Sequence, residues 1–400
     1  MNTGNNKNQF FLESMFDDTE IAFATKTDSE LERAYFLFKM IKNEPLVRIG
    51  TAITNFALKA HMPVEHLIRA SVFDHFCGGV TEEDCMLTID KMFGKKVHAV
   101  LDYSVEGKET EEQFDYAMNK TLKILDFVKE KQSIPFAVFK PTGFGRFEIY
   151  QKITENRTLS EAEQKEWKTI EERYDTVCKK AFENDVPLLI DAEESWMQIA
   201  ADALIERMME KYNKNKAIVY STLQMYRWDR LDYLKDLHKR AAEKGYYIGM
   251  KIVRGAYMEK ERERATEKGY KSPICETKQV TDENYDAAVI YMMENEKMAI
   301  FAGTHNEESS LKLIELADKY NIKKDDIRMW FGQLFGMSDH ISYNLAARGY
   351  NVAKYLPFGP VRDVMPYLIR RAEENTSVAG QTSRELKLLK TERRRRKLTK

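Results

Sequence analysis

The sequence predicts a (βα)8 barrel with an N-terminal helical arm and a basic C-terminal tail. Short runs rich in β-branched and aromatic residues alternate with amphipathic helical runs between Val97 and Asn375, which is typical of a parallel sheet with crossover helices. Eight such runs occur, the number that a closed barrel requires. No GxGxxG turn follows the first run, although a doubly wound nucleotide-binding sheet usually opens with one.

The predicted strands divide the chain into three parts. They cover Val97–Tyr103, Phe136–Lys140, Val186–Asp191, Ala217–Gln224, Tyr247–Val253, Met298–Thr304, Ile327–Gln333 and Val352–Leu356. Before them, apolar residues recur at helical spacing from about Asp28 to Phe93, so residues 1–95 are expected to form a helical arm. The barrel is expected over residues 96–380, and residues 381–400 form the basic tail.

The tail is expected to leave the barrel as a helix or as a disordered segment. Residues 384–400 hold nine basic and two acidic side chains interleaved with leucines. This composition fits a segment that binds an anionic bilayer, and it fits a solvated tail equally well.

Composition argues against several classes of protein. The chain has 63 Lys and Arg against 64 Asp and Glu, a net charge of −1, so no overall field attracts it to nucleic acid. Its four cysteines show no CxxC spacing, which disfavours a zinc site and a disulfide framework and fits a reducing compartment. The N-terminal sequence lacks the features of a signal or transit peptide, and there is no long apolar run. We therefore expect a cytoplasmic protein without a metal.

Reactive side chains gather at the ends of the predicted strands, where barrel enzymes build their active sites. These residues are Lys140, Asp191 with Glu193, Gln224, Arg254, His305, Gln333 and Tyr355, while Lys251 lies inside the fifth strand. Each position alone has an ordinary explanation, because strand ends meet water and polar residues are common there. The convergence of the whole set indicates a site.

The segment after the eighth strand, YLPFGPVRDVMPYLIRRAEEN (Tyr355–Asn375), combines two helical stripes. The apolar stripe, which is expected to pack on the barrel, consists of Val361, Val364, Met365, Leu368 and Ala372. The polar stripe beside it consists of Tyr367, Arg370, Arg371 and Glu374, at i, i+3, i+4 and i+7. Two neighbouring guanidinium groups suit bidentate binding of a carboxylate, so the segment predicts a small acid as ligand.

This segment resembles the C-terminal signature of the proline dehydrogenase family. Other segments look like motifs of the same family, in the family's order: LLIDAEES (188–195), STLQMY (221–226), KIVRGAYMEKER (251–262), FAGTHN (301–306) and QLFGM (333–337). The version VRGAYMEKER, together with a helical insertion near Thr158–Asp175, is more similar to the single-function enzymes than to the large bifunctional ones.

The resemblance implies an activity and a cofactor. The chain would hold FAD non-covalently and oxidise L-proline to Δ1-pyrroline-5-carboxylate, the first step of proline catabolism to glutamate. Hydride would pass from the proline carbon next to nitrogen to flavin N5, with the protein orienting both. Electrons would then pass to a membrane quinone, which implies a possible peripheral position at the inner face of the membrane. A Δ1-pyrroline-5-carboxylate dehydrogenase is a possible partner.

The resemblance also assigns residues by position. Catalysis would involve Lys140, Asp191, Tyr355, Arg370 and Arg371. The proline pocket would be formed by Lys140, Ala256, Leu334, Tyr355, Tyr367, Arg370 and Arg371, with the two arginines on the carboxylate. FAD would contact Gln224, Lys251, Arg254, Gly255, His305, Asn306 and Glu374.

Two of these assignments need qualification. Asp191 is interpreted as a partner for Lys140 or an arginine, because a carboxylate beside a cation stays ionised and is a weak base. Many bacterial members have arginine at the position of Lys251, whereas the mitochondrial type has lysine. The compact lysine charge leaves its role in tuning the flavin less defined.

Three alternatives to this activity remain open. A hydroxyproline dehydrogenase would use the same site, although hydroxyproline-preferring relatives tend to have a smaller residue at the position of Tyr355. A Schiff-base lyase would use Lys140 or Lys251. A non-catalytic barrel would act as a regulator or binding module through its basic tail.

Overall fold

The strands of the protein close into a barrel in chain order. We describe residues 14–42, 72–104, 109–369 and 381–398 of a computed structural model. The eight strands are β1 (Val97–Tyr103), β2 (Phe136–Phe139), β3 (Leu188–Ile190), β4 (Val219–Gln224), β5 (Ile248–Val253), β6 (Met298–Gly303), β7 (Met329–Leu334) and β8 (Val352–Phe358). The assigned pairs, such as β4 with β5 and β1 with β8, are parallel. The predicted (βα)8 fold is confirmed.

The predicted strand positions differ from the observed ones only at the ends. β3 begins two residues later than expected, because Asp185 has a positive φ of 57° and Pro187 has no N–H to donate to a ladder. β8 continues two residues past the predicted end, since its register with β1 extends to Tyr103 opposite Phe358.

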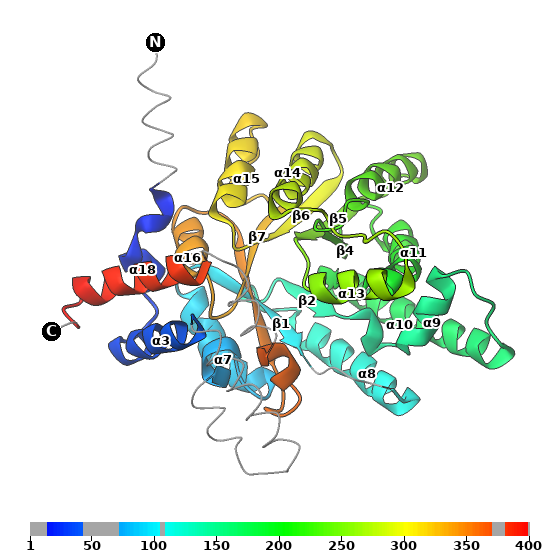
Figure 1. Cartoon of the computed structure of the whole chain (residues 1–400), viewed down its shortest axis with the longest axis horizontal. Coiled ribbons are helices and arrows are strands. Elements are labelled where there is room, and N and C mark those ends of the chain that lie inside the picture. The colour runs from blue at the N-terminus through cyan, green and yellow to red at the C-terminus, as the bar shows by residue number, and fades with distance from the viewer. Residues whose placement is uncertain (1–13, 43–71, 105–108, 370–380, 399–400) are drawn as a thin grey trace. The chain divides into compact units, whose positions relative to one another are not determined.

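Helices follow the strands and give each crossover its return path (Figure 1). In the region 107–332 they are α8 (Glu111–Val128), α9 (Phe147–Thr154), α10 (Glu161–Glu183), α11 (Ser195–Tyr212), α12 (Arg230–Lys244), α13 (Met258–Lys268), α14 (Lys278–Glu294) and α15 (Glu307–Lys319), with a 3-10 turn η3 (Pro141–Gly143) after β2. Several start at a capping box. In α10, the Ser160 hydroxyl accepts the Glu163 backbone N–H, and the Glu163 carboxylate accepts the Ser160 N–H at 2.9 Å.

Aromatic side chains fill the barrel between the strands of this region. Phe136 at the start of β2 packs edge-to-face against Tyr220, Phe301 and Trp330, with ring centroids 5.8, 5.2 and 5.1 Å away. Phe136, Tyr220 and Trp330 lie near the beginnings of their strands. Edge-to-face packing of this kind contributes beyond area burial alone, so the end of the barrel opposite the polar strand ends is a solid core.

The second region lies within residues 1–106 and 333–400 and contains described parts of the N-terminal arm and of the C-terminal part of the chain. Its described helices are η1 (Met15–Asp17), α2 (Thr19–Ala22), α3 (Asp28–Ile41), α6 (Asp74–Phe76), α7 (Glu82–Phe93), α16 (Asp339–Ala347) and α18 (Gln381–Arg395). Part of the predicted arm, including Leu67 and Ala70, lies outside the described residues. No helix among the described residues combines the length and the apolar character needed to cross a bilayer.

The basic tail does not trail away as the sequence led us to expect. It forms α18, which lies beside α3 (Figure 1) and buries Leu386, Leu388 and Leu389 against α2 and α3. Arg393 pairs with Glu32 at 2.6 Å, and Arg396 with Asp28 at 3.0 Å. The spacing of the leucines in the sequence indicates an apolar face on this helix. It does not show what that face packs against, which in the structure includes Leu31, Ala34 and Phe38 of α3.

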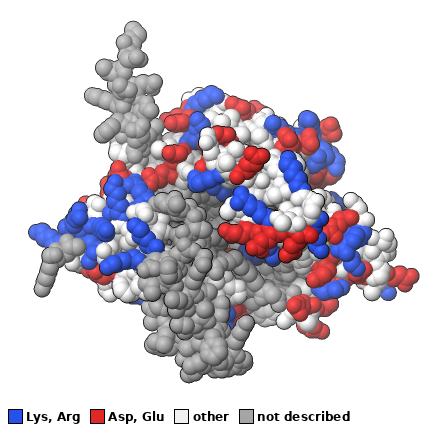
Figure 2. Space-filling model, viewed as in Figure 1, with Lys and Arg blue, Asp and Glu red and all other residues white. Residues whose placement is uncertain are grey.

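The outer face of α18 carries basic side chains that are exposed. Lys387, Lys390 and Arg394 are exposed there, and Figure 2 shows Lys and Arg side chains gathered around this helix. Because the leucines are already buried, the membrane-binding interpretation of the tail loses its apolar component.

A buried ionic cluster also ties this region together. The Lys354 side chain is 0% exposed and its ammonium lies 2.8 Å from Asp339 Oδ1, while Lys26 lies 2.9 Å from Asp339 Oδ2. Burial alone would raise the pKa of Asp339, but the two ammonium groups outweigh it and hold that pKa far below its ordinary value. The Ser338 N–H donates to Glu385 of α18. Arm, barrel and C-terminal helix therefore share one polar network.

We predict that Leu389→Ala lowers the free energy of unfolding by about 3 kcal/mol, because a truncated core leucine leaves a cavity. Leu389 is 1% exposed in the contact between α18 and α3. Its exposed neighbour provides the control, since Lys390→Ala should stay within about 0.5 kcal/mol of wild type. Urea denaturation of the three proteins measures both values. Equal midpoints for both variants would show that this contact contributes no stability.

Candidate functional site

The ends of β2, β3 and β5 bring three of the predicted site residues into direct contact. Lys140 follows β2, Asp191 follows β3, and Lys251 lies within β5. The Lys140 ammonium lies 2.8 Å from Asp191 Oδ2, and the Lys251 ammonium contacts Asp191 Oδ1. One carboxylate thus bridges two ammonium groups that come from separate strands.

Burial strengthens this arrangement. The side chains of Lys251, Asp191 and Lys140 are 8%, 14% and 22% exposed. Burial by itself raises the pKa of Asp191, but attraction from Lys140 and Lys251 and their hydrogen bonds outweigh it and hold the pKa at about 2. Asp191 is therefore ionised at neutral pH and is a poor base, in agreement with its interpretation as a partner for Lys140.

Gln224, at the end of β4, is a buried residue whose side-chain amide is only partly hydrogen-bonded. Its Nε2 reaches the Ala192 carbonyl at 3.5 Å, and within the described part of the chain its Oε1 has no hydrogen-bond partner. The residue is only 3% exposed. A buried acceptor without a donor costs free energy, so this position favours a bound group that donates a hydrogen bond.

Arg254 and Asn306 belong to a second network at the ends of β5 and β6. The Arg254 guanidinium donates to Asp282 Oδ1 at 2.6 Å, Thr304 Oγ1 at 2.8 Å and Ser309 Oγ at 3.0 Å. The Asn306 N–H also donates to Thr304 Oγ1, at 3.1 Å, and the Asn306 side chain caps α15 by accepting the Ser309 N–H at 3.0 Å. Much of the guanidinium is thus engaged inside the protein, and half-buried His305 lies between Thr304 and Asn306.

The turn after Arg254 leaves the backbone accessible. Gly255 has a φ of 128°, and a Cβ there would lie 2.5 Å from the Tyr226 ring, so the position requires glycine. Gly255 and Ala256 are both exposed. A ligand could therefore approach the main chain closely at this turn.

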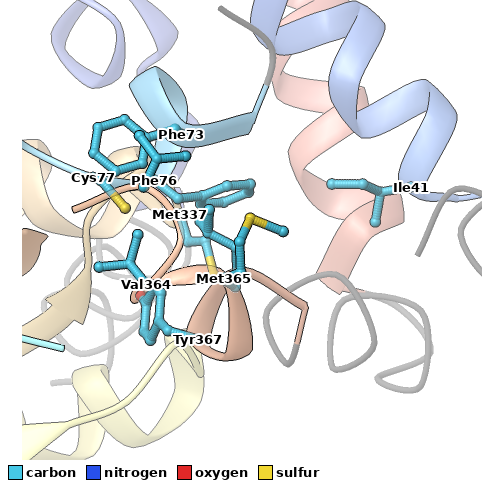
Figure 3. Packing of buried hydrophobic residues seen from close by; sticks show 10 residues of the cluster. Ile41, Phe73, Phe76, Cys77, Met337, Val364, Met365 and Tyr367 are labelled. Atoms are coloured by element: carbon cyan, nitrogen blue, oxygen red, sulfur yellow. The ribbon is translucent and has the colours of Figure 1, made fainter. Parts of the chain in front are cut away.

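Three more predicted residues lie in the region that contains the termini. Leu334 ends β7, Tyr355 lies in β8 and is 8% exposed, and Tyr367 is 6% exposed. Tyr367 belongs to an apolar cluster in which the segment after β8 packs on α6 and on Met337 (Figure 3). The remaining predicted residues, Arg370, Arg371 and Glu374, lie outside the described residues.

The apolar stripe predicted for this segment is confirmed where it is described. Val361, Val364, Met365 and Leu368 are all buried in the cluster of Figure 3, while Ala372 lies outside the described residues. This packing fixes the helix turn that carries Tyr367. Gln333, another of the polar strand-end residues, is 2% exposed and accepts a hydrogen bond from the Ser342 hydroxyl at 2.9 Å.

Comparison with known proteins identifies the family. The family model described as "Proline dehydrogenase" matches residues 85–384 of the 400. The chain belongs to the proline dehydrogenase family. It is therefore an oxidoreductase that acts on proline.

Several relatives of this proline dehydrogenase are similar over most of its length. The carbapenem antibiotics biosynthesis protein CarD of Pectobacterium carotovorum subsp. carotovorum is 38% identical over 80% of this chain and 83% of its own. The mitochondrial proline dehydrogenase 1 of Dictyostelium discoideum is 29% identical over 95% and 74%. The mitochondrial proline dehydrogenase 1 of Homo sapiens is 38% identical over 60% and 40%.

Solved structures support the fold. Proline utilization A (PutA) from Bdellovibrio bacteriovorus, inactivated by N-propargylglycine, superimposes with a TM-score of 0.69 at 20% identity. The alignment covers 93% of this chain but only 37% of that PutA. The chain thus spans little more than a third of the PutA chain that it resembles.

Two pairs of residues beside the site have no role predicted from the sequence motifs. Glu193, two residues after Asp191, accepts both the backbone N–H and the hydroxyl of Thr142, at 2.9 and 2.7 Å. Glu261 of α13 accepts the N–H and the hydroxyl of Ser195 in the same way, at 2.7 and 2.6 Å. Its place after the third predicted strand had put Glu193 among the polar strand-end residues, but nothing in the sequence signalled its partner.

We predict that Asp191→Asn destabilises this proline dehydrogenase by about 2 kcal/mol at neutral pH, because it leaves two partly buried ammonium groups without their counterion. The pKa of Asp191 is held at about 2, below its ordinary 3.8. The ionised group therefore stabilises the fold above about pH 4, and this contribution is lost as the pH falls towards 2. The difference between variant and wild type should narrow over that window.

Chemical denaturation at pH 7, 5 and 3 tests this dependence. Asp185→Asn is the matched control, because Asp185 forms an exposed pair with Lys216 at 2.6 Å that should contribute little. A difference for Asp191→Asn that stays constant down to the lowest pH would contradict the account.

Proposed function

We propose that this chain oxidises L-proline to Δ1-pyrroline-5-carboxylate with a non-covalently bound FAD and passes the electrons to a membrane quinone. This would be the first step of proline catabolism to glutamate. The observation that carries the proposal is the contact of Lys140, Asp191 and Lys251 at one end of the barrel, in a chain of this family. Barrel enzymes place their chemistry at that end.

The residues present fit a flavin dinucleotide. Gln224 offers a buried acceptor that has no donor among the described residues, which suits the N–H of a flavin ring. Arg254 and the capped N-terminus of α15 at Asn306 supply positive charge and donors for a diphosphate, and Lys251 would supply a positive charge near the flavin ring. The exposed backbone at Gly255 and half-buried His305 lie beside them, and Glu374 completes the proposed set. When bound, FAD supplies a two-electron acceptor for hydride.

The chain's own residues would bind and orient proline. Arg370 and Arg371 are proposed to hold the carboxylate, and Lys140, Ala256, Leu334, Tyr355 and Tyr367 would enclose the ring. The ring C–H bond next to nitrogen breaks as hydride, the nitrogen lone pair forms the C=N bond, and the amine loses a proton. Asp191 does not take that proton in this scheme, because its pairing with two lysines keeps it weakly basic.

Hydroxyproline dehydrogenase is the second candidate. A hydroxyproline dehydrogenase of Xenopus laevis is 28% identical over 94% of this chain and 88% of its own length. The large phenol of Tyr355, 8% exposed in β8, leaves little room for a ring hydroxyl and favours proline.

Because the electrons are proposed to pass to a membrane quinone, we propose that the enzyme is cytoplasmic and binds peripherally at the inner face of the membrane. The product would be consumed by a Δ1-pyrroline-5-carboxylate dehydrogenase, which we propose as a functional partner. No role in nucleic-acid binding is proposed, because the chain has a net charge of −1.

Anaerobic titration of the purified protein tests the activity and the choice between candidates. We expect a yellow protein whose visible absorbance is bleached by L-proline before any acceptor is added. Equimolar trans-4-hydroxy-L-proline should bleach it at least about tenfold more slowly. A pocket without space for the extra hydroxyl can discriminate between the two substrates by about that factor. Equal rates would favour the hydroxyproline enzyme. A colourless protein that borohydride traps with an aldehyde would favour the lyase instead.

A further inference from the structure

The turn that follows Lys140 is held by a carboxylate from the neighbouring strand. η3 begins one residue after Lys140, and Thr142 lies at its centre. The Thr142 N–H donates to Glu193 Oε2 at 2.9 Å, and its hydroxyl donates to Oε1 at 2.7 Å. Both oxygens of Glu193 are thus used on a single residue, which fixes the position and the orientation of the turn.

Glu193 is itself held from behind. Its backbone N–H donates to Gln198 Oε1 at 2.8 Å, and Gln198 Nε2 donates to Asp202 Oδ1 at 2.8 Å. Arg230 then donates to Asp202 Oδ2 at 2.7 Å. Gln198 and Asp202 are 1% and 5% exposed, so the chain of bonds is buried and gives Glu193 a rigid base.

The segment that follows β3 also contacts the side chain of Lys140. The Lys140 ammonium contacts Asp191, two residues before Glu193, and the Asp191 N–H donates to the Phe139 carbonyl at 3.0 Å. On the far side of the turn, the Tyr150 hydroxyl donates to the Pro141 carbonyl at 2.9 Å. Lys140 is therefore clamped between its ammonium contact and the turn that follows it.

We propose that Glu193 is a positioning residue for substrate binding, which holds the turn after Lys140 so that the Lys140 ammonium stays against Asp191 in the proline site. This deepens the proposed function and rests on it, because it takes Lys140 as part of the pocket. Glu193 acts through Thr142 and Lys140 and does not itself touch the substrate.

The electrostatic surroundings of Glu193 make its two hydrogen bonds with Thr142 sensitive to pH. The groups that face it are the Lys140 ammonium at the end of β2, Glu194 on its own segment, and the Tyr150 and Tyr174 hydroxyls of α9 and α10. Burial dominates and raises the pKa of Glu193 to about 7, against the hydrogen bonds from Thr142. The ionised carboxylate accepts both Thr142 bonds, whereas the protonated acid has one oxygen converted to a donor.

Glu193→Gln tests the proposal directly. The amide keeps the shape but is neutral, so the Thr142 N–H meets a weaker acceptor, and the Thr142 hydroxyl accepts from the amide nitrogen instead of donating to a charged oxygen. We expect the KM for L-proline to rise about fivefold while kcat changes by less than about twofold, since the lost positioning affects binding more than the chemical step. The acid limb near pH 7 that we expect in the wild-type kcat/KM profile should be absent from the variant.

Two further sets of variants separate positioning from general loss of structure. Glu261→Gln makes the same change at another buried carboxylate, which holds Ser195 rather than Thr142, so it should lower Tm but keep the acid limb. Thr142→Val should raise the proline KM as Glu193→Gln does, and Thr142→Ser should restore it. The double variant Glu193→Gln, Thr142→Val should raise the KM for L-proline no further than the single variant with the larger effect, because both substitutions act on the same contact.

Hydrogen–deuterium exchange of the peptide covering residues 140–145 gives a readout that does not depend on activity. Exchange should be faster in Glu193→Gln than in wild type or Glu261→Gln, because the Thr142 N–H then donates to a neutral and weaker acceptor. If Glu193→Gln does not fold, the Val and Ser variants at Thr142 carry the test. Wild type that fails to oxidise proline would overturn the proposed function. Active wild type with an unchanged KM and pH profile in Glu193→Gln would overturn this inference alone.

Discussion

The site depends on one carboxylate between two ammonium groups. Asp191 brings together Lys140 and Lys251, which belong to segments more than a hundred residues apart in sequence. The contact is possible only because β3, β4 and β5 pair in parallel with a register that places Thr222 opposite Lys251. Without the carboxylate, two like charges would face each other at a partly buried strand end, so the positions of both lysines depend on Asp191.

The four residues that follow Asp191 extend this organisation. Glu193 holds the turn after β2, Glu194 contacts Lys260 of α13, and Ser195 donates twice to Glu261 of the same helix. The exit of β3 is therefore bonded to the segments that follow both β2 and β5. Because those segments carry Lys140 and Arg254, a single loop sets the spacing between the proposed substrate and cofactor contacts. Rigid support of this kind is what keeps binding groups in a productive arrangement.

Much of this could be predicted from the sequence. β-rich runs bounded by helical runs located the strands, and the rule that barrel chemistry lies at strand ends selected Lys140, Asp191 and Gln224. The partners of these residues could not be predicted, because a hydrogen bond such as Thr142 to Glu193 joins positions 51 apart and leaves no periodic signal. For the same reason α18 was expected to leave the fold, although its leucines pack on α3. The ion pair between Arg254 and Asp282 could not be predicted either, because it depends on how α14 packs beside the end of β5.

The proposed reaction breaks a ring C–H bond next to the nitrogen of L-proline at this strand end. Rapid mixing of the anaerobic protein with L-proline that carries deuterium on the ring methylene next to nitrogen tests it most directly. We expect bleaching of the bound flavin to slow severalfold relative to unlabelled proline, whereas deuterium on the carbon bearing the carboxylate should have no primary effect. The same rate for both labelled forms and unlabelled proline, in a step shown to be limited by chemistry, would contradict the account.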